Sequence, residues 1–287
     1  MRHLTDAEVE RALEDADVEG ALRAAFIDLA LGRAAQQPRM RTDAGGVKLS
    51  TLGAVVPSQG VVGAKVYTTI AGRFDFVIVL FSTQDGRPLA TLEANAITRR
   101  RTAAVSLLAA RAAAAHAVSS IVVFGTGVQA KAHAEAFTKA YPRARCRLIG
   151  RDGMGEARAA LADAQVVVTA TRAAEPLFDG AWLAPGTFVS AVGSSRPDTR
   201  ELDDTALSRA ASVIVEWKPQ ALAEAGDLLR LAPPVRDRLQ VLELGDVLAG
   251  HVPARRSRDD IVIFKSVGVG IEDVVVAGLA AGVRPRS

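Results

Sequence analysis

The sequence contains little cysteine, few aromatic residues and almost no net charge. Its single cysteine, Cys146, excludes an internal disulfide. No Cys/His ligand spacing occurs, so we predict no metal site. A formal net charge of +3 over 287 residues is too small to indicate a nucleic-acid partner. The cysteine content fits a reducing, cytoplasmic location.

Long hydrophobic runs are missing as well. The first twenty or so residues are charged throughout and lack the apolar core of a signal peptide. The uncharged stretch 112–130 is interrupted by Ser119, Ser120 and two glycines, so no membrane span and no membrane partner are expected. Hydrophobic residues make up 49% of the chain and charged residues 23%, which is typical of a globular protein, and this length favours two domains.

The first hundred or so residues predict a mixed helix and sheet unit. Thr5 and Glu8 form a capping-box pattern, and apolar residues at helical spacing continue through Leu31. Three segments rich in β-branched and aromatic residues, followed by the turn sequence QDGRP at 84–88, predict a mostly antiparallel sheet with strands at 47–56, 61–70 and 76–82. Thr98 is expected to cap an alanine-rich helix over 99–115.

From Ile121 onwards, strand and helix patterns alternate. This order predicts a doubly wound parallel sheet, an α/β fold of the Rossmann type. The expected strands are 121–124, 146–149, 165–169, 187–192 and 212–215, and the expected helices are 128–140, 155–162 and 203–210. A final helix over 270–282 has a strongly apolar face and is expected to pack on the first unit or on a second subunit.

The strongest local signal is Gly125-x-Gly127-x-x-Ala130, which follows a strand pattern and opens a helix pattern. In a dinucleotide-binding unit the first glycine makes the tight turn, and the second lets the backbone approach the pyrophosphate. Ala130 permits close packing of the helix on the strand. The N–H groups at the helix start then bind the phosphates. An ordinary glycine-rich turn is the alternative.

The end of the next strand predicts the choice of cofactor. NAD sites place an acidic residue there for the ribose 2′-hydroxyl, but this chain has Gly150 followed by Arg151. A missing carboxylate and a guanidinium that can bind a 2′-phosphate favour NADP(H) over NAD(H). The alternative is that Asp152 performs the role of the acid and Arg151 is a solvated surface charge.

Five segments together resemble the ornithine cyclodeaminase/mu-crystallin family, closest to its ketimine reductase (Δ1-pyrroline-2-carboxylate reductase) branch. They are AKVYTT (64–69), AITRRRTAAVS (96–106), VVFGTGVQAKAHAEAF (122–137), AVGSSRPDTRELDD (191–204) and IVIFKSVGVGIEDVVVA (261–277). The resemblance implies a homodimer with two domains in each subunit. Residues 1–112 with 268–287 would form a discontinuous α+β domain for substrate binding and dimerisation, and 113–267 the Rossmann domain.

The resemblance also implies a small imino or amino acid substrate and the residues that hold it. Arg101 would bind the carboxylate, with Thr102 beside it, and Lys65 would contact the substrate and support proton transfer. A second arginine comes from QPRMRT, where Arg41 matches the family better than Arg39 does. The alternatives are a solvated basic helix face for Arg99–Arg101 and an edge-strand lysine for Lys65. His133 is expected to be an ordinary helix residue, exposed or packed, rather than a base.

For the cofactor we predict contacts along the carboxyl ends of the strands. Besides Gly125, Gly127, Gly150 and Arg151, the predicted contacts are Thr126, Val128, Gln129, Thr169, Ala170, Thr171, Val192, Ser266 and Gly268.

Ser195 departs from the pattern of the cyclodeaminases. Where this chain has VGSS, those enzymes have a sequence similar to VGGD and use its aspartate for deamination. A serine cannot act as a carboxylate base near neutral pH. We therefore predict NADPH-dependent reduction of Δ1-pyrroline-2-carboxylate or Δ1-piperideine-2-carboxylate to L-proline or L-pipecolate, with Ser195 near the substrate. The alternatives are NAD-dependent ornithine cyclodeaminase, reductive amination, and a non-catalytic NADPH-dependent binding protein. The short connection at 68–76 and Val77, where a polar residue is expected, leave the ring size of the substrate open.

Overall fold

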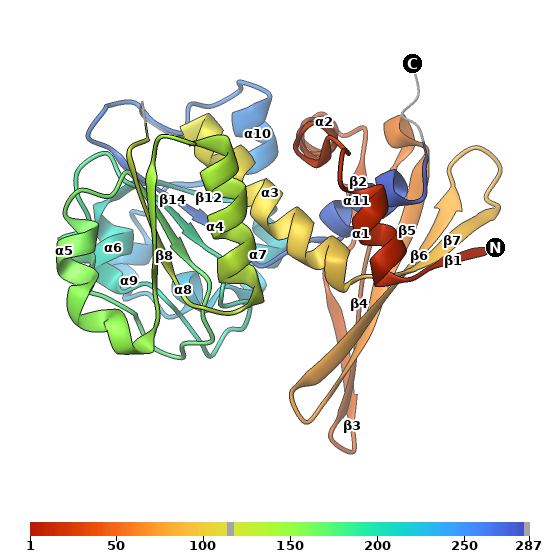
Figure 1. Ribbon diagram of the computed structural model, residues 1–287, viewed down its shortest axis with the longest axis horizontal. Coiled ribbons are helices and arrows are strands. Elements are labelled where there is room, and N and C mark those ends of the chain that lie inside the picture. The colour runs from red at the N-terminus through yellow and green to blue at the C-terminus, as the bar shows by residue number, and fades with distance from the viewer. Residues whose placement is uncertain (114–117, 284–287) are drawn as a thin grey trace. The chain divides into compact units, whose positions relative to one another are not determined.

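The computed structural model describes residues 1–113 and 118–283, and the chain divides into two units (Figure 1). Unit 1 comprises Met1–Ala104 and Gly268–Ser287, and unit 2 comprises Val105–Val267. The first division falls inside helix α3 (Asn95–Ala113), a few residues before the predicted boundary at 112. The predicted end of this helix at 115 lies outside the described residues.

Unit 1 is built on a seven-stranded sheet with the order β1-β7-β6-β5-β4-β2, and β3 pairs with β4. All pairs are antiparallel except β1 with β7, as the sequence predicts. The strands are β1 (Arg2–Leu4), β2 (Ala35–Gln36), β3 (Met40–Ala44), β4 (Val47–Val56), β5 (Val61–Ile70), β6 (Arg73–Ser82) and β7 (Pro88–Glu93); the short 3-10 helix η1 (Pro57–Gln59) joins β4 to β5.

The β5–β6 hairpin is tighter than the sequence patterns predict. Strand β6 begins at Arg73 rather than at 76, and only Ala71 and Gly72 connect it to β5. Both have positive φ, 48° and 75°, which is the backbone geometry that matches the twist of a two-residue hairpin. Because the hairpin is continuous, the alternation of side chains that begins at Val61 extends unbroken to the tip.

One face of this sheet is covered by helices from both ends of the chain. Helix α11 (Gly270–Ala280) packs on β4 and β5 and against α1 (Asp6–Ala12) and α2 (Val18–Ala30), beside which it lies in Figure 1. A Cβ at Gly270 would lie 2.6 Å from the carbonyl oxygen of Gly53, so glycine permits this close crossing. Of the two places expected for the last helix, the structure shows the first unit.

The predicted cap of α3 is wrong. Thr98 lies inside the helix, where its N–H donates to the carbonyl of Ala94. The carboxylate of Asp6 accepts from the N–H of Ala96 and from the side chain of Asn95, both at 2.9 Å. A side chain distant in sequence therefore binds the first turn, and the helix starts at Asn95, earlier than its local cap signal indicates.

Unit 2 is a doubly wound parallel sheet with the order β13-β12-β14-β11-β10-β8-β9, which confirms the predicted fold class. Its strands are β8 (Ser120–Phe124), β9 (Arg145–Ile149), β10 (Val166–Thr169), β11 (Phe188–Ala191), β12 (Ala210–Val215), β13 (Val241–Glu243) and β14 (Ile261–Lys265). Its helices after α3 are α4 (Val128–Ala140), α5 (Ala157–Leu161), α6 (Asp204–Arg209), α7 (Lys218–Glu224), α8 (Gly226–Leu229), α9 (Pro233–Arg236) and α10 (Leu244–Leu248), with 3-10 turns η2 (Arg151–Glu156) and η3 (Gly180–Trp182).

Strands β8, β10, β11 and β14 are buried along their whole length, as expected for the centre of a parallel sheet covered on both sides. The direction in which successive strands are added to the sheet reverses at β8. Strand β9 lies on one side of β8, and β10 and β11 lie on the other. In open α/β sheets this reversal point, at the carboxyl ends of the strands, is where ligands bind.

Candidate active site

The glycine turn lies at this reversal point in unit 2. Gly125 has φ +116°, and a Cβ there would lie 2.6 Å from the carbonyl oxygen of Ala170 at the end of β10. Gly127 is the N-cap residue of α4 and is exposed, with no atom within 4 Å of the position its Cβ would occupy. Within the described chain no side chain caps α4. The turn therefore offers an open helix N-terminus to an anion.

The end of β9 lies beside the same turn. Gly125 N–H donates to the carbonyl of Ile149, and a Cβ at Gly150 would lie 3.1 Å from Cγ2 of Thr126. Arg151 is exposed and begins η2. The pair Gly150 and Arg151 thus occupies the place where a carboxylate would lie in an NAD site.

The other residues predicted to contact the cofactor lie in different settings. Ala170 N–H donates to Phe124, and Val192 N–H donates to Thr169, so the loops after β8, β10 and β11 are adjacent. Val128 is 64% exposed on the first turn of α4, with Gln129 following it. Ser266 is buried and donates to Glu216 at 2.5 Å.

Unit 1 contains a buried cluster of charges that includes the predicted catalytic residues. Lys65 on β5 and Arg101 on α3 both contact the first turn of α11. Lys65 Nζ lies 2.7 Å from Oδ2 of Asp273, and Arg101 Nε lies 3.2 Å from Oδ1 of the same carboxylate. Arg101 Nη1 also pairs with Glu272 at 2.6 Å. All four side chains are buried, so the structure brings Lys65 and Arg101 together through Asp273.

Of the other residues predicted to bind the substrate, one lies beside this cluster and the others do not. Arg39 Nη2 donates to the carbonyl of Gly268 at 2.8 Å, and the guanidinium of Arg101 packs on the same glycine, where a Cβ would lie 2.8 Å from Nη2. Arg41 is exposed on β3. Thr102 donates to Thr98 within α3. Arg39 is therefore the arginine of the QPRMRT segment that lies at the cluster.

The charges in the cluster shift each other's pKa. Burial, opposed by Asp273 and reinforced by Arg101, lowers the pKa of Lys65 from 10.5 to about 8. Burial alone would raise the pKa of Asp273, but Lys65 and Arg101 hold it below its usual value. The ammonium also lies 5.0 Å from the centre of the Phe76 ring. Lys65 is thus a lysine that can exchange its proton near neutral pH.

Sequence reasoning missed the acidic half of this cluster. Glu272 and Asp273 are the only charged residues of α11, and both are fully buried in an otherwise apolar helix. Carboxylates in such surroundings need cationic partners, which was the available signal. It also missed Glu201, Asp227 and Lys265, which are buried at the carboxyl edge of the sheet in unit 2.

Two further predictions concern single residues of unit 2. Ser195 is half-buried in the loop after β11. His133 is fully buried on α4: one ring nitrogen lies 2.7 Å from the carbonyl oxygen of Gln129 and the other 3.0 Å from the hydroxyl of Ser106. It is a packed helix residue, one of the two settings expected for it.

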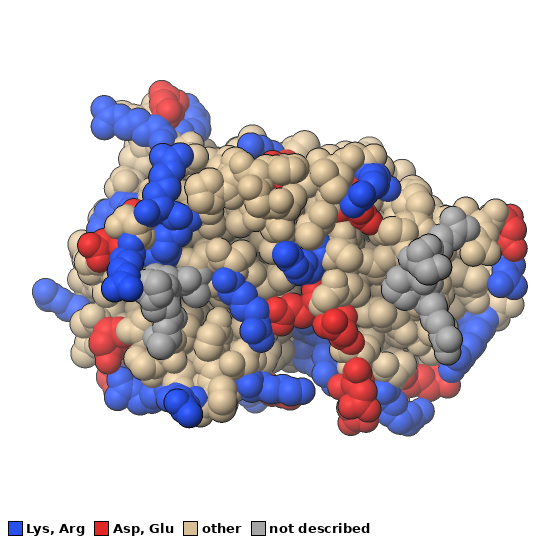
Figure 2. Space-filling view, turned by 90° about the horizontal axis from the view of Figure 1, so that it is seen from above, with Lys and Arg blue, Asp and Glu red and all other residues tan. Residues whose placement is uncertain are grey.

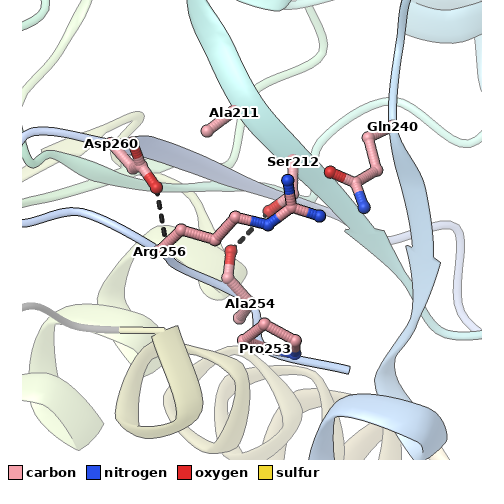
Figure 3. A pocket seen from close by; sticks show the side chains of 7 residues that line it. All are labelled: Ala211, Ser212, Gln240, Pro253, Ala254, Arg256 and Asp260. Atoms are coloured by element: carbon pink, nitrogen blue, oxygen red, sulfur yellow. Dashed lines mark hydrogen bonds between the residues drawn. The ribbon is translucent and has the colours of Figure 1, made fainter. Parts of the chain in front are cut away.

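A separate pocket of about 200 Å³ lies in unit 2 at the amino-terminal ends of the strands, opposite the edge that carries the glycine turn (Figure 3). Its walls come from the amino-terminal ends of β12, β13 and β14, with the Arg256 side chain lying across it. Ser212 donates to the carbonyl of Ala254, and Asp260 accepts from the N–H of Arg256. The lining residues are Ala211, Ser212, Gln240, Pro253, Ala254, Arg256 and Asp260. This edge is not where ligands of such sheets bind.

On the face in Figure 2, basic and acidic side chains are interspersed among uncharged ones, in keeping with the small net charge. Within 1–113 and 118–283 no helix is long and apolar enough to cross a membrane, and no group of His, Cys, Asp and Glu is arranged to hold a metal ion.

Comparison with known proteins gives matches over nearly the whole chain. The model of the ornithine cyclodeaminase/mu-crystallin family matches residues 1–161 and 152–281. A Δ1-pyrroline-2-carboxylate reductase of Bacillus cereus is 36% identical over 260 residues, which cover 82% of this chain and 76% of the relative. The predicted resemblance is confirmed.

Two solved structures share the fold at full length. A probable ornithine cyclodeaminase from Bordetella pertussis Tohama I has a TM-score of 0.88 at 49% identity, covering 98% of this chain and 96% of that one. The Δ1-pyrroline-2-carboxylate reductase of Thermococcus litoralis, in complex with NADH and L-proline, has a TM-score of 0.87 at 25% identity and covers both chains fully, 100% of each.

Proposed function

The chain belongs to the ornithine cyclodeaminase/mu-crystallin family, and from that premise we propose that it is an imine reductase that uses a nicotinamide nucleotide. Its substrate would be a small cyclic ketimine carboxylate, Δ1-pyrroline-2-carboxylate or Δ1-piperideine-2-carboxylate, and its product L-proline or L-pipecolate. The relative from Bacillus cereus and the structure from Thermococcus litoralis carry the name of this activity.

The residues at the glycine turn fit a dinucleotide. Gly127 leaves the space of a side chain open at the uncapped start of α4, and Gly125 adopts a backbone that a side chain would strain. Gly150 and Arg151 support NADP(H), because Gly150, beside Thr126, stands at the position where an NAD site has its acidic residue, and the exposed guanidinium of Arg151 follows it directly. When bound, the reduced nicotinamide supplies a hydride.

The buried cluster of unit 1 supports binding and protonation of an imino acid. Lys65 and Arg101 balance Glu272 and Asp273 in charge, and Arg39 beside the cluster adds one positive charge, which suits a single carboxylate. Reduction adds a hydride to the imine carbon and a proton to the imine nitrogen. Lys65, with its pKa lowered to about 8, is the proposed donor of that proton.

The single observation that favours reduction over cyclodeamination is Ser195. Deamination and ring closure need a carboxylate at this position, whereas a preformed C=N bond is already electrophilic. The likeness to the probable ornithine cyclodeaminase of Bordetella pertussis keeps that lyase as the second candidate. The lyase would release ammonia from ornithine without net consumption of the cofactor.

Both candidates are tested in one set of assays. The protein is mixed with NADPH, or with NADH, and each cyclic imine, and the absorbance of the reduced cofactor is followed. In parallel, ammonia release from ornithine is measured with NAD present. Oxidation of the reduced cofactor with either imine supports the proposal. Ammonia release without oxidation would replace it with the lyase, and cofactor binding with neither activity would indicate a binding protein.

We also propose a homodimer through the uncovered face of the sheet in unit 1. Strand alternation places several exposed apolar side chains on the face opposite Lys65. They are Met40, Val47, Leu49, Val55, Ile70 and Val77, each more than 40% exposed. Such a contiguous apolar face is typical of a protein interface. Replacing Val77 by Asp should convert the dimer to a monomer in a measurement of mass in solution, and a wild-type monomer would contradict the proposal.

A further inference from the structure

Glu201 is a fully buried carboxylate that joins the ends of two neighbouring strands in unit 2. Its Oε1 accepts from the N–H and the hydroxyl of Thr171, at 2.8 and 2.7 Å. Its Oε2 accepts from the hydroxyl of Thr169 at 2.8 Å and from the N–H of Gly193 at 2.7 Å. One side chain thus holds the loop after β10 against the loop after β11.

Asp227 and Lys265 fix Glu201 in turn. Oδ1 of Asp227 accepts from the N–H groups of Glu201 and Leu202, at 2.8 and 2.9 Å, and Oδ2 pairs with Lys265 Nζ at 2.8 Å. Lys265 also donates to the carbonyl of Ser194 at 2.6 Å. Burial would raise the pKa of Asp227, but Lys265 and the two N–H groups hold it below its usual value. Both ends of the segment 194–201, which carries Ser195, are therefore bound to buried charges.

The glycines around this network leave no room for a side chain. A Cβ at Gly193 would lie 2.3 Å from the carbonyl oxygen of Thr171 and 2.4 Å from Oε1 of Glu201. A Cβ at Gly226 would lie 2.0 Å from the carbonyl oxygen of Thr199. The loop after β11 is thus packed tightly between the loop after β10 and the start of α8.

These loops border the place where the second half of a dinucleotide would lie. In such sites the 2′-hydroxyl of the adenosine ribose binds at the end of the second strand, here β9, on one side of the glycine turn. The nicotinamide half then extends to the other side of β8, over the ends of β10 and β11. Ala170, between the two threonines that bind Glu201, is the residue in contact with the turn at Gly125.

We propose that Glu201, fixed by Asp227 and Lys265, is a positioning residue that holds the loops after β10 and β11 in the form that receives the nicotinamide half of the cofactor. The inference rests on the proposed use of a nicotinamide nucleotide but not on the identity of the imine.

The substitution Glu201→Gln separates hydrogen bonding from packing. Glutamine keeps the shape, but in either orientation its NH₂ group faces a backbone N–H, that of Thr171 or that of Gly193. One loop must then lose its bond. Because bonds to a charged acceptor are the stronger ones, we expect NADPH binding to weaken roughly tenfold to a hundredfold.

Asp203→Asn is the matched control. Asp203 also accepts backbone N–H bonds, from Ala206 at 2.7 Å and Gly180 at 3.1 Å, but these lie away from the strand ends at Thr169–Thr171 and Gly193 that Glu201 binds. Both variants and the wild type are compared by thermal unfolding, by fluorescence titration with NADPH in the absence of imine, and by the KM values for NADPH and for the imine. The proposal expects weaker NADPH binding and a raised KM for NADPH in Glu201→Gln alone, with little change in the KM for the imine.

A folded Glu201→Gln variant with unchanged NADPH affinity would overturn the proposal and leave Glu201 a stabilising residue only. If that variant does not fold, Thr169→Val removes one bond to Glu201 without changing volume, and it should weaken NADPH binding several-fold. Unchanged affinity in that variant would overturn the proposal as well. A wild type that binds NADPH but reduces no imine would contradict the proposed reaction, and the role of Glu201 in cofactor binding could still be tested. A wild type that binds neither NADPH nor NADH would contradict both the proposed reaction and the role of Glu201.

Discussion

The contact between Lys65 and Asp273 makes a prediction about the pH dependence of the reaction. Replacing Asp273 by Asn removes the anion 2.7 Å from Lys65 Nζ and leaves the ammonium facing Arg101 and Arg39. With Asp273 in place, burial still outweighs the attraction and brings the pKa of Lys65 to about 8, a cost of about 3 kcal/mol for holding the charged form. Without Asp273 that cost increases.

The size of the effect follows from the geometry. An opposite charge in contact displaces a pKa by roughly one to three pH units, so the variant should lose the protonated form of Lys65 at correspondingly lower pH. If Lys65 donates the proton to the imine, kcat/KM falls as pH rises through the pKa of Lys65 in the free enzyme. The alkaline limb should lie near pH 8 in the wild type and roughly one to three pH units lower in Asp273→Asn.

Stability changes with pH in the opposite direction. Lys65 has a lower pKa in the folded state than the usual 10.5, so between about pH 8 and 10.5 the unfolded chain binds more protons. The contribution of Lys65 to the free energy of unfolding therefore increases with pH across that window. In Asp273→Asn the window should begin at lower pH. Loss of one partner of a buried pair also costs about 3 kcal/mol or more of stability, so folding must be verified by circular dichroism.

The assay is the initial rate of NADPH oxidation with a cyclic imine, measured from about pH 4.5 to pH 10 for the wild type and two variants. Asp43→Asn is the control, because Asp43 also pairs with a lysine of the same sheet, Lys48 at 3.7 Å, but both are exposed. Its alkaline limb should coincide with that of the wild type. A folded Asp273→Asn variant whose limb has not moved would refute the assignment of the proton donor to Lys65.

Three further predictions concern the glycine turn, Arg151 and Lys65. Gly125→Ala should lower both the unfolding temperature and NADPH affinity, because its Cβ would meet Ala170, whereas Gly127→Ala should lower NADPH affinity alone; equal stability losses would contradict this. Arg151→Gln should reduce the ratio of kcat/KM for NADPH to that for NADH by roughly tenfold or more, and an unchanged ratio would exclude a 2′-phosphate contact. Lys65→Met should lower kcat/KM by at least about a hundredfold while NADPH affinity, measured by fluorescence, stays at the wild-type value.

Much of the fold could be predicted because the signals are local. Strand β5 begins and ends at the residues that its apolar pattern indicates, and the capping box at Thr5 and Glu8 is present. The glycine turn could be located because strand, turn and helix follow one another within a few residues. The start of α3 could not be predicted, since the carboxylate that caps it, Asp6, is contributed by a distant part of the chain.

The candidate site could be predicted only in its cationic half. Lys65 and Arg101 belong to segments that resemble the family, but the carboxylates that bind them lie on the last helix, and no local pattern joins the two. The choice between Arg39 and Arg41 was equally non-local: β3 is exposed along its whole length, Arg41 included, and the carbonyl of Gly268, at the start of the returning segment, accepts from Arg39. A buried lysine nevertheless implies an anion, and α11 contains only two.

The two units use the same pair of groups for different purposes. Lys265 shares Asp227 with two backbone N–H groups and donates to a carbonyl, so every contact of this pair binds it to a loop. Lys65 shares Asp273 with another cation, Arg101. Burial lowers the pKa of this lysine to about 8, Asp273 opposes the shift, and Arg101 reinforces it. A buried lysine with a lowered pKa can release a proton at moderate pH, whereas the contacts of Lys265 with Asp227 and Ser194 fix the backbone around it. The second cation on Asp273 thus adds to the effect of burial on the proposed proton donor.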